Sequence, residues 1–416
     1  MRWRALLGLA AASAALLLGA ASASAQVVSA EQLQRLDAFL QADTAPGAHL
    51  GAVVMLAQRG QVVYHKAFGQ RDLARREPMA LDHIFRIYSM TKPVVSVALL
   101  MLLEEGRLTL DDPVAMHLPY FAGQRVWTGG TADAPQLREP ARRLTVRHLM
   151  THTAGLATGG GDAARSLLER AAPWAATNLD DYARRVAKAP LAADPGTRFQ
   201  YDGVNTEVLS RIIEVVSGQP FDIVLQGRIF DPLRLVDTGF SVPAAQRHRI
   251  ADISAVGPDG RLVLAPGPSA TAPGVPLNAY FSGAGGLYST AADYLRFCQM
   301  LLNGGTLDGV QLLSRKTVDL MRTNQLAHLD PIAGLSPGEG FGLGVSVVID
   351  PARRGRLSSA GAYGWSGAAT TYFTIDPQEQ MIAILLMQHL PRDDLPGEPA
   401  KPSVTFYNLV YQALQQ

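Results

Sequence analysis

The stretch Ser89-Met90-Thr91-Lys92-Pro93 leads into an apolar run, Val94 to Glu105, that is followed by Gly106. Proline lacks an N–H and is tolerated only in the first turn of a helix, so this run predicts a helix that begins near Ser89 or Met90. A glycine is typical of the residue that follows a helix. We therefore expect Ser89 at a helix N-terminus, where unpaired N–H groups and the dipole favour developing negative charge.

Lys92 lies three residues after Ser89, a spacing that puts both side chains on one face of the helix. A free serine is a weak nucleophile, and a neighbouring amine can take its proton or orient it. The chain has five lysines, and only Lys92 has a serine three positions before it. Lys92 could act as a neutral base, or its ammonium could support a tyrosine that takes the proton. The spacing leaves both roles open.

Working outward from this helix, strand-like runs lie toward both ends of the chain and helical runs lie between them. The strand-like runs are residues 50–58, 61–68, 341–349, 370–375 and 381–388, the first two forming a hairpin across Arg59-Gly60. Helices are expected at residues 31–41, 146–151, 181–188, 204–217, 221–230, 291–303 and 404–414. Residues 257–286 are rich in proline and glycine and predict a long irregular connection.

This order predicts an α/β (α+β) fold in which an antiparallel sheet is built from the two ends of the chain. The expected sheet domain comprises residues 26–88 and 287–416, with terminal helices covering it. A mainly helical subdomain, residues 89–286, is inserted between the two parts.

Composition excludes several classes of protein. Of the 416 residues, 48% are hydrophobic and 18% are charged, which is unlike a disordered chain. The net charge of +1 argues against a nucleic-acid partner, which would select a surplus of lysine and arginine. The single cysteine, Cys298, permits no internal disulfide and no Cys-based metal site, and its apolar neighbours predict a buried side chain. We expect neither metal nor cofactor.

The first 25 residues read as a secretory signal peptide. Arg2 and Arg4 form a basic segment, residues 5–20 are apolar, and Ala23-Ser24-Ala25 is a cleavage signal. The apolar run is shorter than the roughly 20 residues that span a bilayer as a helix. The expectation is an exported protein, periplasmic or secreted, that is cleaved after Ala25 and has no stable membrane span.

Two further motifs follow the Ser89–Lys92 pair. They are Leu149-Met150-Thr151-His152-Thr153-Ala154-Gly155-Leu156 and Phe281-Ser282-Gly283-Ala284-Gly285-Gly286-Leu287-Tyr288-Ser289-Thr290. Together the motifs resemble the serine hydrolases of the class C β-lactamase and penicillin-binding-protein group, and they are most similar to the family VIII carboxylesterases. The resemblance extends from about Gly51 to Gln388. It implies a β-lactamase/transpeptidase-like fold: a five-stranded antiparallel sheet with flanking helices and an all-α domain.

The resemblance also assigns residues to the site. The family's Tyr-x-Asn motif matches Tyr201-Asp202-Gly203, so Tyr201 takes the position of the catalytic tyrosine and Gly203 stands where the family has asparagine. Asn205 could replace that asparagine only if the loop differs. In β-lactamases the asparagine contacts the substrate amide, so its loss counts against β-lactam hydrolysis more than against ester hydrolysis.

The third family motif is matched by Trp365-Ser366-Gly367, the W-x-G variant of family VIII esterases. A tryptophan in place of a cation removes a partner for substrate carboxylates and adds apolar surface, which favours neutral esters. By resemblance, the backbone N–H of Ala368 pairs with that of Ser89 as an oxyanion hole. Trp365 could instead be a core residue on a strand.

Two competing motifs fit poorly. Gly334-Leu335-Ser336-Pro337-Gly338 matches G-x-S-x-G, but that motif needs a strand before it and a helix after it, and only His389 follows as a base. His148 and His152 have zinc-protease spacing without the required glutamate, which favours a structural or capping role.

The sequence therefore predicts a serine hydrolase that cleaves short-chain carboxylic esters through an acyl-enzyme on Ser89, with weak β-lactam hydrolysis in addition. The alternatives are a β-lactamase, a D-amino-acid peptidase, or a non-catalytic penicillin-recognising protein. The expected partner is a small ester or β-lactam-like molecule. The oligomeric state is left open.

Overall fold

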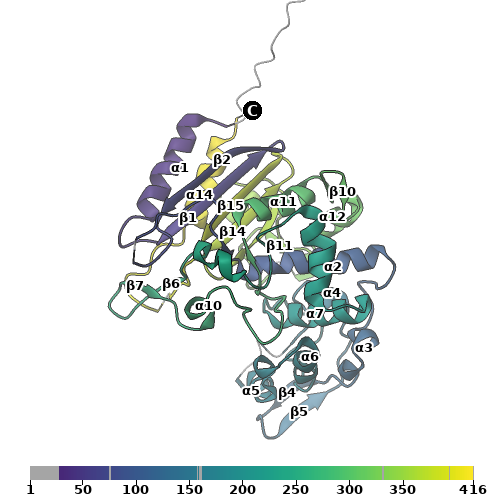
Figure 1. Ribbon diagram of the computed structural model, residues 1–416. Coiled ribbons are helices and arrows are strands. Elements are labelled where there is room, and N and C mark those ends of the chain that lie inside the picture. Colours follow the sequence, from purple (N-terminus) through teal and green to yellow (C-terminus); the bar gives the residue numbers. More distant parts are fainter. Residues whose placement is uncertain are drawn as a thin grey trace, which may run out of the picture.

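A seven-stranded antiparallel sheet forms the centre of the protein in the computed structural model, which describes residues 28–74, 76–156, 158, 162–329, 332–392 and 394–415 (Figure 1). The strand order is β11-β12-β13-β14-β15-β1-β2. The strands are β1 (Gly51–Gln58), β2 (Gln61–Gly69), β11 (Glu339–Phe341), β12 (Ser346–Val348), β13 (Tyr363–Gly367), β14 (Thr371–Asp376) and β15 (Met381–Met387). The expected signal peptide lies outside the described residues.

The two ends of the chain meet in the middle of this sheet. Strand β1 pairs with β15 in antiparallel register, from Ala52 opposite Met387 to Gln58 opposite Met381. The β1–β2 hairpin turns at Arg59-Gly60, where φ is +50° and +77°, a conformation that favours glycine at the second position. The sheet therefore joins segments from both ends of the chain, as the order of strand-like runs predicts.

The expectation of five strands is wrong in two places. Residues 341–349, expected as one strand, turn back on themselves, with Gly344 at φ +84° and the Gly342 N–H bonded to the Val345 carbonyl at 2.8 Å. A side chain at Gly342 would meet the Met321 carbonyl at 2.1 Å, so the close approach needs glycine there. The other addition is β13, which carries Trp365 and pairs with both β12 and β14.

Helices bury both faces of the sheet. On β1, Val54 and Leu56 pack with the terminal helices α1 (Ala30–Asp43) and α14 (Ser403–Ala413), which lie side by side in Figure 1. The alternate residues belong to a second, larger cluster that includes α11 (Ala291–Leu302) and α2 (Thr91–Glu104). Successive strand residues point to opposite faces, so this continuously apolar strand fits a sheet covered on both sides.

Helix α2 is the central helix of the molecule. Every residue from Thr91 to Leu102 is buried, as expected for a helix that is apolar on all sides. It connects the inner face of the sheet to the helical region drawn in the lower part of Figure 1. The other helices labelled there are α3 (Val114–His117), α4 (Val146–Met150), α5 (Asp162–Ala171), α6 (Leu179–Ala187) and α7 (Val204–Ser217). Helices α8 (Phe221–Leu225) and α9 (Asp231–Leu233) follow α7 along the chain.

The remaining elements are short. They are the paired strands β3 (Phe85–Arg86) and β8 (Tyr288–Ser289), β4 (Val126–Gly130) and β5 (Pro135–Arg138), β6 (Ser254–Val256) and β7 (Leu262–Leu264), and β9 (Thr306–Leu307) and β10 (Val310–Gln311), with helices α10 (Pro268–Thr271), α12 (Arg315–Met321) and α13 (Pro351–Arg354). Strand β7 and helix α10 lie inside residues 257–286. That connection is therefore less irregular than predicted: Gly257 and Gly260 form the β6–β7 turn, and a short helix follows.

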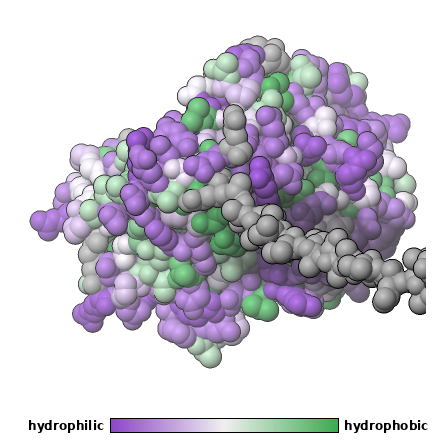
Figure 2. All heavy atoms as spheres, turned by 90° about the horizontal axis from the view of Figure 1, so that it is seen from above, coloured by the Kyte–Doolittle hydropathy of each residue, from purple (hydrophilic) through white to green (hydrophobic). Residues whose placement is uncertain are grey.

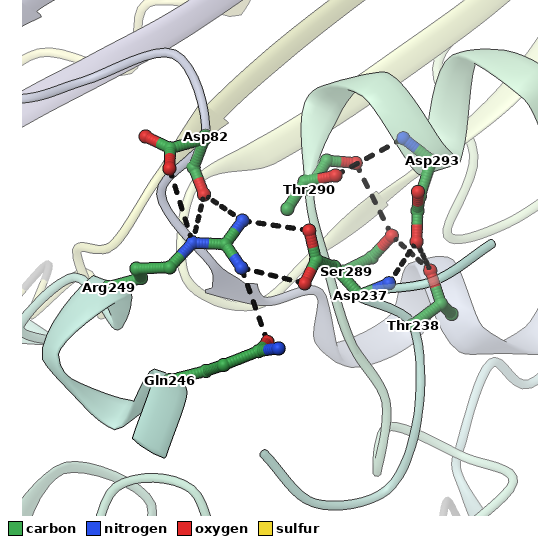
Figure 3. Close-up of polar contacts among 8 residues, drawn as sticks. All are labelled: Asp82, Asp237, Thr238, Gln246, Arg249, Ser289, Thr290 and Asp293. Carbon is green, nitrogen blue, oxygen red and sulfur yellow. Dashed lines mark hydrogen bonds and ion pairs between the residues drawn. The ribbon is translucent and has the colours of Figure 1, made fainter. Parts of the chain in front are cut away.

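A polar network ties the segment after α9 to helix α11 (Figure 3). Both carboxylate oxygens of Asp237 accept from the guanidinium of Arg249, each at 2.7 Å. The Asp293 carboxylate of α11 accepts from the backbone N–H of Asp237 at 2.7 Å and from the hydroxyl of Thr238 at 2.8 Å. The bidentate geometry defines the position of this segment, since two parallel bonds restrict rotation.

The face drawn in Figure 2 is mostly hydrophilic, with small apolar patches between polar residues. None of the helices in the described ranges has the length and apolarity that crossing a membrane requires.

Candidate active site

Ser89 lies in a short 3₁₀ turn, Tyr88–Met90, directly before α2. The residue before it, Tyr88, has φ +44°, a conformation that is rare for a bulky residue and costs about 1–3 kcal/mol. Bonds on both sides hold the turn in place. The Tyr88 hydroxyl donates to Ser269 Oγ at 3.0 Å, and the Tyr294 hydroxyl donates to the Met90 carbonyl at 2.9 Å. Ser89 itself is half-buried, so it remains accessible at the helix start.

Lys92 is buried in the first turn of α2 and points back at Ser89. Its Nζ donates to Ser89 Oγ at 3.0 Å and to the backbone carbonyl of Ala284 at 2.7 Å. The same Nζ lies 4.9 Å from the centre of the Tyr201 ring. The amine therefore joins three elements that are far apart in the sequence: α2, the segment before β8, and the segment before α7.

Tyr201 and Trp365 form the opposite side of the site. The indole N–H of Trp365 donates to the Tyr201 hydroxyl oxygen at 2.8 Å, and the two rings lie 4.8 Å apart. Such an N–H donor stabilises negative charge on the phenol oxygen. Trp365 is the middle residue of β13 and is half-buried, so it is both a strand residue and part of the site.

His152 packs beneath Tyr201, with ring centres 4.6 Å apart. It is buried, and burial, followed by the nearby charge of Lys92, lowers its pKa well below the ordinary value. A neutral imidazole in this position adds no second cation beside Lys92. Phe199 and Phe341 complete this aromatic cluster around His152.

The end of β13 lies against the turn that carries Ser89. A side chain at Gly367 would come within 2.3 Å of the Ile87 carbonyl, so only glycine permits this approach. Ala368 follows and is exposed. The structure thus brings Ser89, Lys92, Tyr201 and Trp365 together and places Gly367 and Ala368 beside the turn, while the roles of these residues stay predictions.

Gly203 stands at the start of α7, where a side chain would meet the Cβ of Ala284 at 3.1 Å. Asn205 is buried within the first turn of α7, and its side-chain N–H donates to Asp202 Oδ1 at 2.8 Å. Asn205 therefore faces Asp202.

Two acidic residues beside Lys92 escaped the sequence analysis. Glu207 on α7 is buried and accepts from the Ser282 hydroxyl and from the Gly283 N–H at 2.9 Å. Asp202 accepts from Thr158 and from the start of α7. Burial raises the pKa of both carboxyl groups, that of Glu207 to about 7. The sequence signal that could have identified Glu207 was a carboxylate among the apolar residues of the helix predicted at 204–217.

The competing motifs form no second site. Residues 334–338 lie in a turn before the short strand β11, without the following helix that a nucleophile elbow requires. His389 bonds to Ser254 Oγ at 3.0 Å and to Glu398 at 2.8 Å, a Ser-His-Glu arrangement. Ser254 is completely buried and also bonds to the Gln388 carbonyl, so this group holds strands together and is closed to substrate.

His148 caps α4, accepting from the Thr145 N–H at 3.1 Å. Among the residues that the structure describes, no group of three or more His, Cys, Asp or Glu side chains could hold a metal ion.

A serine at a helix start, a lysine one turn on and a tyrosine across from them, on a sheet-and-helix fold, define a serine hydrolase of the Ser-x-x-Lys class. The chain belongs to the beta-lactamase family, whose sequence profile matches residues 36–401.

Relatives include esterases. Esterase EstB of Burkholderia gladioli is 30% identical over 370 residues, covering 85% of this chain and 89% of that protein. Lovastatin esterase of Penicillium rubens is 31% identical and covers 72% of this chain and 74% of its own. The solved structure of EstCE1, described as a hydrolase with promiscuous acyltransferase activity, is 25% identical with a TM-score of 0.73, covering 91% of this chain and 98% of that one.

Proposed function

We propose that the protein is a carboxylesterase that forms an acyl-enzyme on Ser89. The observation that carries this proposal is the 3.0 Å bond between Lys92 Nζ and Ser89 Oγ at the start of α2. Esterase EstB and lovastatin esterase, similar over most of the chain, support ester hydrolysis as the activity.

In the proposed reaction Tyr201 acts as a phenolate base: Ser89 Oγ attacks the ester carbonyl while its proton passes to the Tyr201 oxygen, which becomes a neutral phenol. Lys92 orients Ser89 and places positive charge beside the Tyr201 ring, and Trp365 donates to the Tyr201 oxygen. The tetrahedral intermediate collapses, the alcohol leaves with the proton from Tyr201, and the acyl group stays on Ser89. Water then attacks the acyl-enzyme by the reverse proton route. The N–H groups of Ser89 and Ala368 are the proposed donors to the oxyanion.

Two features favour esters over β-lactams and peptides. Gly203 leaves no amide side chain where β-lactamases bind the substrate amide, and Asn205 turns away toward Asp202. Trp365 stands where a cation would bind a substrate carboxylate, and its indole N–H is already bonded to Tyr201. A neutral, short-chain ester needs neither an amide side chain to bind a substrate amide nor a cation to bind a substrate carboxylate.

Covalent labelling tests the chemistry. A fluorophosphonate should label the wild-type protein and leave Ser89→Ala unlabelled, and a folded wild-type protein that takes no label would refute the serine-hydrolase mechanism. Turnover then tests the substrate class. We expect p-nitrophenyl butyrate to be hydrolysed with a higher kcat/KM than a chromogenic cephalosporin, and the reverse order would favour a β-lactamase.

We further propose that the protein is exported to the periplasm or the medium after cleavage behind Ala25, on the strength of the leader pattern in residues 1–25. The N-terminal sequence of the protein recovered from its native host should begin at Gln26.

A further inference from the structure

Glu207 is bonded to residues 282–286, the segment that accepts a hydrogen bond from Lys92. One carboxylate oxygen accepts from the Ser282 hydroxyl, and the other accepts from the Gly283 N–H at 2.9 Å. The next residue in that segment, Ala284, offers its carbonyl to Lys92 Nζ at 2.7 Å. A carboxylate on α7 and an amine on α2 therefore hold the same short stretch of backbone from two sides.

This stretch has little freedom apart from those bonds. A side chain at Gly283 would meet Ser210 Oγ at 2.0 Å, and one at Gly286 would meet the Ser282 carbonyl at 2.7 Å. The backbone of the segment is thus packed closely between α7 and its own turn. Because Glu207 bonds to its start and Lys92 to its middle, a displacement at Glu207 would be passed directly to the Ala284 carbonyl.

The charges around Glu207 point the same way. Lys92 is the cation that acts on this carboxylate and on that of Asp202, while Tyr182 of α6 and Tyr280 face Glu207 with neutral phenols. Lys92 is only 3% exposed, and a buried ammonium is costly without a nearby opposite charge. Glu207 supplies such a charge without touching the amine, so Lys92 keeps a donor for Ser89.

We propose that Glu207 is a positioning residue of the hydrolase: its carboxylate holds residues 282–284 so that the Ala284 carbonyl directs Lys92 onto Ser89. This inference rests on the proposed roles of Ser89 and Lys92. It assigns a function to a side chain that contacts neither substrate nor nucleophile.

The proposal has a pH signature. Burial raises the pKa of Glu207 to about 7, against the opposing effects of the Ser282 and Gly283 bonds and of Lys92. Below that pH the carboxyl takes up a proton, and one of its two acceptor oxygens becomes a donor facing the Ser282 hydroxyl and the Gly283 N–H. The hydrogen bonds from Glu207 to this segment weaken, so the reactivity of Ser89 should fall as the pH drops through about 7.

The test measures the rate at which a fluorophosphonate labels Ser89 between pH 5 and 9, because labelling needs the nucleophile but no particular substrate. In Glu207→Gln we expect labelling at pH 8 to fall about 10- to 100-fold, the cost of a small misplacement of a reacting group, and the change near pH 7 to disappear. Glu214→Gln is the matched control: the same substitution two turns along α7, at a carboxylate bonded to Arg211 and the Phe221 N–H.

A second variant separates positioning from folding. Ser282→Ala removes one donor to the ionised carboxylate and leaves the carboxyl group in place, so it should move the pH midpoint upward relative to the wild type. A merely structural role would lower the rate at every pH without moving the midpoint. Circular dichroism confirms that each variant is folded.

The proposal is overturned if Glu207→Gln labels as fast as Glu214→Gln with an unchanged profile. It is also overturned if the wild type shows no change near pH 7, or if Ser282→Ala leaves the midpoint where it was. If the wild type is labelled but hydrolyses no ester, the esterase function fails while the labelling profiles still decide the role of Glu207. If the folded wild type takes no label, both proposals fail.

Discussion

Trp365→Phe removes the hydrogen bond to Tyr201 and keeps most of the aromatic packing. The indole N–H lies 2.8 Å from the Tyr201 oxygen, and the Trp365 ring also packs against Phe341 at 5.2 Å, a contact that a phenyl ring can partly preserve. A bond to an oxygen that carries negative charge during the reaction is worth about 1.5–3 kcal/mol. At 1.36 kcal/mol for each factor of ten, the expected loss in kcat/KM is about 10- to 150-fold.

The assay is hydrolysis of p-nitrophenyl butyrate across a range of substrate concentrations. Because the bond acts on the residue that moves the proton and not on the bound ester, kcat should carry most of the loss and KM should change little. Trp127→Phe is the control, since its indole N–H is buried and makes no hydrogen bond to any residue that the structure describes. That variant should retain activity within about twofold of the wild type.

A double-mutant cycle sharpens the result. In a Tyr201→Phe background the indole N–H has lost its acceptor, so adding Trp365→Phe should cost little further activity. A loss below about threefold in the single variant would refute the idea that Trp365 tunes Tyr201. An equally large loss in both backgrounds would show that Trp365 acts through substrate packing and not through the hydrogen bond.

Three further predictions follow from other contacts. Gly367→Ala should abolish hydrolysis, because its Cβ would come within 2.3 Å of the Ile87 carbonyl and push the Ser89 turn aside; ester assays on folded protein check this. Arg249→Gln should lower the free energy of unfolding by about 2 kcal/mol, measured by urea titration, because it breaks the two bonds to Asp237. His148→Gln should reduce the loss of stability in acid. Burial lowers the pKa of His148 from 6.5 to about 4, so between these pH values the folded state binds fewer protons than the unfolded state, and the free energy of unfolding falls as the pH drops. Urea titrations of the wild type and the variant at pH 7 and 5 measure this change.

Local patterns predicted the elements that local chemistry determines. Helix α7 runs from Val204 to Ser217, as its apolar periodicity indicates, and it ends where Gly218 adopts φ +74°. The β1–β2 hairpin turns at Gly60 for the same reason. The pairing of Ser89 with Lys92 was likewise visible, because both belong to one helical turn and need no tertiary information.

The parts that were missed depend on distant residues. Trp365 and Tyr201 are 164 residues apart, and no spacing rule predicts that an indole and a phenol so separated will share a hydrogen bond. Glu207 lay unnoticed on an apolar helix because its partners, Ser282 and Gly283, come from another segment. Residues 341–349 looked like one strand because their apolar content hid the role of Gly342, which the Met321 carbonyl alone explains.

The pairing of β1 with β15 has a consequence for how the protein is made. Strand β1 can pair with β15 only after Met387, the partner of Ala52, has been synthesised, so the middle of the sheet stays open until nearly the whole chain has left the ribosome. Until then β1 presents an apolar, unpaired edge, the kind of surface that promotes aggregation. Closure over such a sequence separation is entropically costly and slow, so the enzyme should mature late and as a unit. A truncation that stops short of β15 should therefore leave Ser89 without a working site, although Ser89 and Lys92 would both still be present.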